Sequence, residues 1–304
     1  MPTRVILDTD IGTDVDDVLA LGLILASPEL KLEGITCVYG NVHLRARIAL
    51  KLLRLRGITG VPVMTGAAKP LLGIRPVYWA GHEGKGLLDS EDESRLVPLH
   101  EHAVDFIVRS VMDNPNEIHL VAIGPLTNIA MAFLREPRLA QNLGHLTLMG
   151  GVVRGVNRLD LPYCEHNIRC DPEAAHIVFT AGAPLSMVPL DVTLQVRIYP
   201  SGIERIRQTG TPYHLALARQ VELYPPFKEQ GFTYTHDPLA IAALIQPDLM
   251  QTSSLHVDIE TNGRFTAGAT LVRTPVEDAP ANADVALQVD GPRFESFMIN
   301  RLKT

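Results

Sequence analysis

The segment that follows the first apolar run of the chain carries five carboxylates within ten residues, at Asp8, Asp10, Asp14, Asp16 and Asp17. Ionised carboxylates this close together repel one another strongly unless a cation compensates their charge. Carboxylate oxygens favour Ca²⁺ or Mg²⁺ over softer metals. The residue types and their spacing therefore predict a site for a hard divalent cation.

A purely structural interpretation explains part of this acidity. Asp14 has the side chain of a helix N-cap, and the next two aspartates would lie in the first helical turn, where the helix dipole favours acids. Asp8 and Asp10 remain unexplained. With a period of two they share one face of a strand, at the carboxyl end where α/β proteins bind ligands. This placement favours metal binding or catalysis for the pair.

Strand-like and helix-like segments alternate along the chain. Strands are expected at residues 4–8, 32–38, 61–65, 118–122, 146–149 and 185–188, and helices at residues 16–26, 43–56, 102–112, 126–135 and 171–180. Short strands separated by turn residues follow at residues 255–260, 267–273 and 285–289. The pattern predicts a Rossmann-like α/β fold, with a mostly parallel central sheet flanked by helices and short antiparallel additions near the C-terminus.

Composition narrows the class of partner. The chain has 304 residues, of which 46% are hydrophobic, enough for a sizeable core, and we interpret residues 1–304 as a single domain. The net charge of −7 and the lack of a basic run argue against a nucleic-acid polymer, because phosphate binding needs clustered Lys and Arg. A small-molecule substrate fits better.

Cysteine usage and hydropathy indicate the compartment. Cys37, Cys164 and Cys170 have the spacing of neither a disulfide framework nor a thiolate metal site, which favours a reducing cytosol. The N-terminus enters a strand without an apolar signal region, and the longest apolar run, residues 18–26, is far too short to span a membrane. We therefore expect a cytoplasmic protein with no membrane partner.

Loops and strand ends carry further signals. The polar stretches 66–98 and 151–170 are too long for ordinary connections, and such loops usually carry function. Gly40, Gly124 and Gly150 each follow a predicted strand, where glycine lets the backbone approach a ligand closely. These positions lie within longer motifs.

The combination of motifs resembles the inosine-uridine preferring nucleoside hydrolase family over residues 4 to about 297. The motifs are the N-terminal aspartate cluster, Val38-Tyr39-Gly40-Asn41, Ile123-Gly124-Pro125-Leu126-Thr127-Asn128, Glu165-His166-Asn167 and His236-Asp237-Pro238. An aspartate cluster alone has little specificity, whereas five motifs in order at matching intervals are specific. The resemblance implies the nucleoside hydrolase fold and hydrolysis of ribonucleosides to free base and ribose.

For the metal, the resemblance implies a Ca²⁺ bound by Asp10, Asp17, Asp237 and the main-chain carbonyl of Ile123. Asp10 would also be the general base that, with the metal, activates the attacking water. Such a site suits ribosyl transfer, because carboxylates stabilise the positive charge of an oxocarbenium-like transition state. Ribose and water oxygens would complete the coordination.

For the sugar, the resemblance implies that Asp16 binds the 2′-hydroxyl and Glu165 the 5′-hydroxyl. Asn41 and Asn167 would bind the ribose diol. A site that pairs every hydroxyl discriminates against analogues that lack one, because buried polar groups are then left unpaired. We therefore expect ribonucleosides to be preferred over 2′-deoxyribonucleosides.

The chain departs from the commonest family pattern in the aspartate cluster, where two residues are inserted. The apolar run follows Asp16 and Asp17 at the family's interval, so we match these two with the family's aspartate pair. Asp14 is then an extra residue, expected to be a cap.

A second departure lies before the Glu-His-Asn motif. Leu159 occupies the position, six residues before Glu165, at which the family usually has Asn. Either Asn157 or Asp160 takes over a 5′-hydroxyl contact after a loop shift, or that contact is absent.

The departing base must be protonated, and His236 and His82 are the candidates, since histidine suits proton transfer near neutral pH. A lone loop histidine is often only solvated, but the family position of His82 in a mobile active-site loop favours a role at the substrate. Trp79 and Tyr234 are the expected stacking partners of the base, with Tyr224 and Phe232 as further candidates, although loop aromatics more often anchor packing.

Two other functions remain open. A haloacid-dehalogenase-like phosphohydrolase also begins with a strand and Asp-x-Asp, and would use Mg²⁺ with Asp8 as covalent nucleophile, but it gives the later motifs no role. A non-catalytic nucleoside-binding protein would keep the metal ligands without needing Asp10 as a base. The family resemblance also implies a homodimer or homotetramer, and purine or pyrimidine preference stays open.

Overall fold

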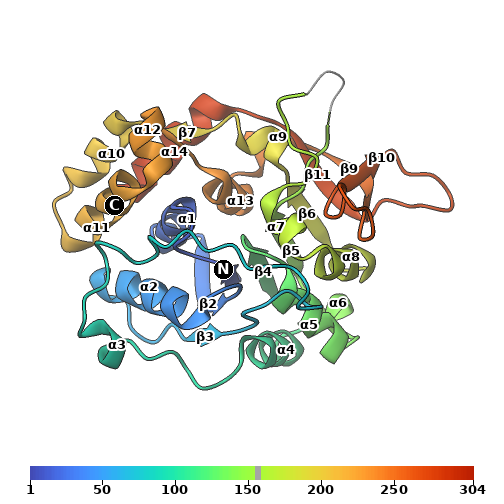
Figure 1. The fold of residues 1–304 in the computed structure, drawn as a ribbon, viewed down its shortest axis with the longest axis horizontal. Helices are drawn as coiled ribbons and strands as arrows, with labels where there is room; N and C mark the ends of the chain where they lie inside the picture. The colour runs from blue at the N-terminus through green and yellow to red at the C-terminus, as the bar shows by residue number, and fades with distance from the viewer. Residues whose placement is uncertain (155–158) are drawn as a thin grey trace.

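The computed structural model describes residues 1–154 and 159–304. Strands and helices alternate through the first two thirds of the chain, as the sequence predicts (Figure 1). The elements of this part are β1 (Thr3–Thr9), α1 (Asp16–Leu25), β2 (Leu30–Cys37), α2 (Val42–Leu55), β3 (Val63–Thr65), α3 (Asp92–Arg95), α4 (Ala103–Asp113), β4 (Ile118–Ala122), α5 (Thr127–Arg135), α6 (Leu139–Asn142), β5 (His145–Met149), α7 (His166–Cys170), α8 (Pro172–Thr180) and β6 (Leu185–Val188).

A largely helical segment, for which the sequence pattern gave no prediction, follows β6. It contains α9 (Leu190–Thr193), β7 (Arg197–Ile198), α10 (Pro200–Arg207), α11 (Pro212–Leu223), α12 (Pro225–Gln230), β8 (Thr233–Tyr234), α13 (His236–Ile245) and the 3₁₀ turn η1 (Pro247–Leu249). Proline opens α10, α11 and α12, where its fixed φ suits the first helical position. The chain ends with β9 (Met250–Ile259), β10 (Thr270–Arg273), β11 (Ala283–Val289) and α14 (Gly291–Leu302).

Within the described residues, nine strands form one sheet in the order β10-β9-β11-β6-β5-β4-β1-β2-β3. All neighbours from β3 to β6 are parallel, while β9 and β10 are antiparallel to their neighbours. The predicted mostly parallel sheet with antiparallel additions near the C-terminus is confirmed. One detail differs, because β11 runs parallel to β6 and so continues the parallel sheet before β9 reverses direction.

Helices cover both faces of this sheet (Figure 1). Along β1, Val5 and Leu7 pack with α1 and α2 on one face, whereas Ile6 packs with α4 and α5 on the other. All three side chains are fully buried. A strand that is buried on both faces is a continuous apolar run, which explains why the sequence before the aspartate cluster does not alternate with polar residues.

The strand order places the change of winding direction between β1 and β4. From β1 the chain adds β2 and β3 on one side of the sheet, and then returns to add β4, β5 and β6 on the other. Open α/β sheets bind ligands at the carboxyl ends of the strands at such a point. Asp10 follows β1 and Ile123 follows β4, so both predicted residues emerge there.

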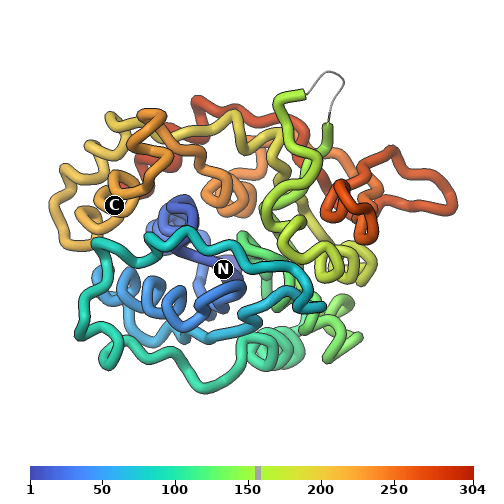
Figure 2. Tube along the Cα trace, viewed as in Figure 1, coloured from blue at the N-terminus to red at the C-terminus, as the bar shows by residue number. Residues whose placement is uncertain are grey.

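The long connection from β3 to α4 contains the four-residue helix α3. In Figure 2 it runs across the face of the molecule that is turned to the viewer. Its start is fixed to the end of β2 by a hydrogen bond from the Tyr39 N–H to the Ala67 carbonyl (2.7 Å). Further along, the Lys85 carbonyl accepts from the Gln220 side chain of α11 (3.1 Å). The connection thus joins the β2 edge to the helical segment after β6. Within the described residues, no helix is both long and apolar enough to cross a membrane.

Candidate active site

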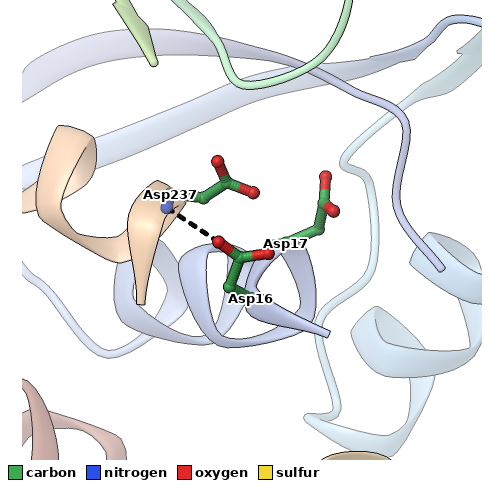
Figure 3. A group of neighbouring side chains, drawn as sticks. All are labelled: Asp16, Asp17 and Asp237. Carbon is green, nitrogen blue, oxygen red and sulfur yellow. Dashed lines mark hydrogen bonds between the residues drawn. The ribbon is translucent and has the colours of Figure 1, made fainter. Parts of the chain in front are cut away.

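Three carboxylates meet where α1 and α13 pack against each other. One oxygen each from Asp16, Asp17 and Asp237 lies within 4.8 Å of the others, and the three residues are at most 4% exposed. Figure 3 shows Asp16 and Asp17 on the first turn of α1, with Asp237 on the first turn of α13 above them. The Asp237 N–H donates to Asp16 Oδ2 (3.1 Å), so one helix start is tied directly to the other.

The electrostatics of this group suit a bound cation. Burial raises the pKa of all three carboxyl groups well above the usual aspartate range, and neighbouring carboxylates raise it further. A bound divalent cation would reverse both effects, because it offsets the repulsion and favours the ionised form. An all-oxygen donor set fits Ca²⁺ or Mg²⁺. The residues present therefore fit a hard divalent cation.

Asp10 lies beside this group, in the turn after β1. The Asp10 carboxylate is 3.8 Å from the Arg45 guanidinium. A Cβ on Gly124 would lie 2.8 Å from Asp10 Oδ1. Asp10 raises the pKa of both Asp17 and Asp237 through its charge. It is near enough to act with the cluster, but it is not one of the three carboxylates within 4.8 Å of one another.

Arg45 of α2 was not singled out from the sequence, yet it organises this turn. The side chain is fully buried, and it donates to the carbonyls of Tyr39 (2.5 Å), Asp10 and Ile11 (3.0 Å). The same guanidinium donates to Thr13 Oγ1 (3.1 Å). One buried cation thus joins the start of α2 to the acidic turn.

Asp8 has a different environment from Asp10, which corrects the expectation that the two share a face. Asp8 is fully buried below the pocket, where its Oδ1 accepts from Thr36 (2.5 Å) and from Asn128 (2.8 Å). Burial raises the Asp8 pKa to about 7. The strand ends at Thr9, so the period of two does not extend to Asp10.

Asp14 is not the expected cap. Val15 is the N-cap of α1 and makes no capping hydrogen bond through its side chain. Asp14 Oδ1 accepts from the adjacent Val15 N–H (2.6 Å), a contact outside the helix, the Asp14 side chain also hydrogen-bonds the Tyr224 side chain, and it lines the pocket. The insertion therefore adds a carboxylate to the site. Asp171, by contrast, caps α8, which lies within the helix predicted at residues 171–180.

A pocket of about 1500 Å³ opens above the carboxylates. It brings together most of the predicted site residues, namely Asp10, Asp16, Asp17, His82, Ile123, Glu165, Asn167, His236 and Asp237. Asn41, Trp79 and Tyr234 are not in its lining. Segments far apart in the sequence thus converge on one cavity.

The three residues outside the lining make contacts within the protein. Asn41 is exposed and caps α2 by accepting from the Leu44 N–H (3.0 Å). The Trp79 ring lies against Gly40, where a Cβ would come within 2.9 Å of it. Tyr234 packs against Phe232, with ring centroids 5.4 Å apart. Tyr234 also lies beside His236, with ring centroids 5.3 Å apart, and substrate binding by the three residues remains a prediction.

Both predicted histidines line the pocket and are oriented by hydrogen bonds. His236 Nδ1 is 2.7 Å from Thr193 Oγ1, and His82 Nε2 is 2.8 Å from the Thr13 carbonyl. Burial lowers the pKa of His236, partly opposed by the charge of Asp14. The ring of Tyr224 lies 5.9 Å from that of His82 and lines the same side of the pocket. Imidazoles and an aromatic ring therefore face the cavity together.

Glu165 and Asn167 lie at the start of α7. Glu165 is the N-cap, and its carboxylate accepts from the N–H groups of Gly151 (3.0 Å), Asn167 (2.7 Å) and Ile168 (3.2 Å). The Asn167 side chain donates to the carbonyls of Ile123 (3.0 Å) and Met149 (3.1 Å). Helix capping fixes the Glu165 side chain, and carbonyls that follow or end strands fix the Asn167 side chain.

The second departure from the family pattern is described in part. Leu159 is 93% exposed and makes no part of the pocket lining. Asn157 lies outside the described residues. Asp160 is exposed and is likewise not in the lining.

Three pocket residues were given no role from the sequence, namely Tyr39 and His166, which lie within quoted motifs, and Cys170. The ring of His166 contacts those of Tyr39 (6.4 Å) and Tyr78 (6.1 Å) edge to face. Cys170 Sγ is 3.5 Å from His166 Nε2, but burial raises the thiol pKa to about 12, so it is not a ready thiolate. Motif membership alone could have marked the first two.

A family model described as "Inosine-uridine preferring nucleoside hydrolase" matches residues 5–296. The chain belongs to this family. It is 37% identical to the inosine-uridine preferring nucleoside hydrolase of Leishmania major, covering 100% of this chain and 98% of the relative. It is 35% identical to the pyrimidine-specific ribonucleoside hydrolase RihA of Salmonella arizonae, covering 100% and 99%.

Solved structures agree with this assignment. A plant nucleoside hydrolase superposes with a TM-score of 0.86 at 30% identity, covering 100% of both chains. A purine-preferring ribonucleoside hydrolase from Gardnerella vaginalis superposes with a TM-score of 0.83 at 31% identity, covering 99% of this chain and 98% of that one. The predicted fold and the predicted enzyme class are therefore confirmed.

Proposed function

We propose that this nucleoside hydrolase family member cleaves the N-glycosidic bond of ribonucleosides at the carboxylate cluster, with Ca²⁺ as its metal. The supporting observation is the buried set of Asp16, Asp17 and Asp237 beneath a pocket of about 1500 Å³. Buried, mutually repelling carboxylates are costly for folding, which is expected where a function needs them.

We assign Asp10, Asp17, Asp237 and the Ile123 carbonyl to the cation. A bound Ca²⁺ would supply positive charge to the ribose hydroxyls and lower the pKa of a bound water. Asp10 accepts the proton of the attacking water, whose oxygen bonds to the anomeric carbon as the glycosidic bond breaks. Arg45 keeps Asp10 directed toward the pocket through its contacts with the turn.

The sugar is recognised by acceptors on different elements. Asp16 on α1 accepts from the 2′-hydroxyl through the oxygen that does not bind the Asp237 N–H. Asn167 contacts the diol, and Glu165 at the start of α7 contacts the 5′-hydroxyl. Asn41 contacts the diol through its Nδ2, since the α2 cap uses its Oδ1.

The base leaves toward the side of the pocket lined by His82, Tyr224 and His236. His236 donates a proton to the departing nitrogen through Nε2, because its Nδ1 is held by Thr193. His82 binds the base, and Tyr224 stacks on it. The named relatives include inosine-uridine preferring, pyrimidine-specific and purine-preferring enzymes, so similarity of this degree leaves the preferred base open.

The phosphohydrolase alternative is not favoured, because Asp8 is fully buried and is not in the pocket lining. A covalent nucleophile must reach its substrate.

We also propose a single domain over residues 1–304, a homodimer or homotetramer, and a cytoplasmic location. These follow from the sequence and the family resemblance.

The test is release of free base and reducing sugar from inosine, adenosine, uridine and cytidine, measured separately. Each reaction is repeated after prolonged chelation and again after Ca²⁺ or Mg²⁺ is restored. We expect base release that chelation abolishes and Ca²⁺ restores. If the folded, Ca²⁺-loaded protein binds nucleosides but returns them unchanged, it is a binding protein and the proposed activity is wrong.

A further inference from the structure

The acidic turn, residues 10–15, joins β1 to α1 and is two residues longer than the commonest family pattern. Thr13 and Asp14 line the pocket from this turn. His82 and Tyr224, to which the proposed function assigns the base, line the same pocket from the β3–α4 connection and from the corner between α11 and α12. Hydrogen bonds link the acidic turn to both of these segments.

The first link fixes the segment that carries His82. The His82 Nε2 donates to the Thr13 carbonyl (2.8 Å), since a carbonyl oxygen can only accept. The Thr13 hydroxyl donates to Glu83 Oε1 (3.1 Å), which also accepts from the Ala80 N–H (2.9 Å). Because Arg45 donates to the same Thr13 hydroxyl, the turn that holds this segment is itself fixed.

The second link fixes Tyr224. Its N–H lies 3.2 Å from the carbonyls of Gln220 and Val221, which ties its backbone to the end of α11. Its side chain is hydrogen-bonded to the side chain of Asp14. Burial, and after it the charge of Asp14, raise the pKa of the Tyr224 hydroxyl, so the phenol is the donor and the carboxylate the acceptor.

Between these two anchors the Tyr224 ring lies edge to face with that of His82, at 5.9 Å between centroids and 62° between planes. The carboxylate that holds the hydroxyl is itself oriented, since Asp14 Oδ1 accepts from the Val15 N–H (2.6 Å). A side chain that is held before its ligand arrives loses less rotamer freedom on binding. The ring proposed to stack on the base is therefore preorganised by the acidic turn.

We propose that Asp14 is a positioning residue for the base, which acts by holding the Tyr224 ring in its stacking orientation. This rests on the proposed function, which places the base against Tyr224. The Asp14 carboxylate contributes as a hydrogen-bond acceptor, so it affects the binding of ligands that carry a base more than it affects the chemical step. Free ribose, which lacks a base, gains nothing from this contact.

The experiment measures kcat and KM for inosine and uridine, and inhibition by ribose, in Asp14→Ala, Tyr224→Phe and the double variant. Tyr224→Phe keeps the ring and removes only the hydroxyl. We expect each single variant to raise KM about threefold to tenfold with a smaller change in kcat. The double variant should be no worse than the single ones, because both substitutions remove the same hydrogen bond. Inhibition by ribose should change less than about twofold.

Two further variants serve as controls. Asp14→Asn removes the charge but keeps an oxygen that accepts from the phenol, so its KM should stay within about twofold of the wild type. Tyr199→Phe removes a hydroxyl outside the pocket lining and should leave KM unchanged. If Asp14→Ala fails to fold, Tyr224→Phe tests the same hydrogen bond alone.

The charge of Asp14 also raises the pKa of His236, and this gives the competing explanation. Equal losses in Asp14→Ala and Asp14→Asn, mainly in kcat, would mean that Asp14 acts through its charge, and the positioning role is then wrong. Additive losses in the double variant, or an unchanged KM in Tyr224→Phe, also overturn it.

The proposed function can fail separately. If no nucleoside is cleaved, dissociation constants of inosine and ribose are compared by calorimetry in the same variants. Weaker binding of inosine with unchanged binding of ribose supports the positioning role without the hydrolase activity. Equal affinity for inosine in wild type, Asp14→Ala and Tyr224→Phe overturns the positioning role.

Discussion

Asp16, Asp17 and Asp237 are at most 4% exposed and come from the first turns of two packed helices, whereas Tyr78, Tyr163 and Phe265 are 57–82% exposed and come from long connections. Both groups line one pocket. Helices and strand ends hold the first group in a fixed geometry, and loops carry the second. From this contrast we expect the base of the pocket to determine the reaction and its walls to determine the substrate.

The largest expected effect is at the base of the pocket. Asp17→Asn removes a proposed metal ligand, and we expect kcat/KM for nucleosides to fall by about a thousandfold or more, with weaker Ca²⁺ binding by calorimetry. Asp14→Asn is the matched control, because it removes a pocket carboxylate of the same turn that lies outside the cluster. A loss of similar size in both variants would mean that the total charge matters, and not the cluster.

The 2′-hydroxyl contact of Asp16 gives the next effect. Uridine should be cleaved roughly a hundredfold or more faster than 2′-deoxyuridine, because the deoxy substrate leaves a buried carboxylate oxygen unpaired. The comparison is made on kcat/KM with the wild-type enzyme. Comparable rates would show that Asp16 does not bind the sugar.

His236 tests whether a wall residue takes part in chemistry. His236→Ala should lower turnover of natural nucleosides about a hundredfold, the usual contribution of a general acid. An activated p-nitrophenyl riboside needs no protonation of its leaving group, so its turnover should be nearly unchanged. Equal losses on both substrates would indicate a structural role for His236.

The smallest expected effect concerns two buried histidines outside the pocket, which should change the pH dependence of stability and not the activity. His119 and His145 are paired at the amino ends of β4 and β5, away from the pocket, and burial lowers the pKa of both. The neutral forms are favoured in the folded state, so this stability is present above pH 6.5 and is lost as the pH falls through the lowered values.

We expect the fall in Tm from pH 7 to pH 5 to be smaller by on the order of a few °C in His119→Gln than in the wild type. Activity near pH 7 should be unchanged. His100→Gln, at an exposed position, should keep the wild-type pH dependence of Tm. Identical pH dependence in all three proteins would contradict the prediction.

Much of the fold could be predicted because periodicity is local. The continuous apolar run of β1 and the helical spacing after Asp16 both follow from side chains that a single element must bury. The helical segment around α10 to α12 was not predicted, since its helices pack partly through contacts with distant elements such as α14. The parallel direction of β11 depends on its neighbour β6 and not on its own residues.

The sequence by itself predicted acidic residues at the base of the pocket, because Asp10 follows a strand and Asp16 and Asp17 open the helix after it. Only the tertiary structure decided which of the remaining side chains reach the pocket. Asn41 is engaged in a helix cap, Asp8 is turned below the pocket, and Arg45 is buried in the acidic turn. Turn geometry and long-range packing set these orientations, and local periodicity carries no information about either.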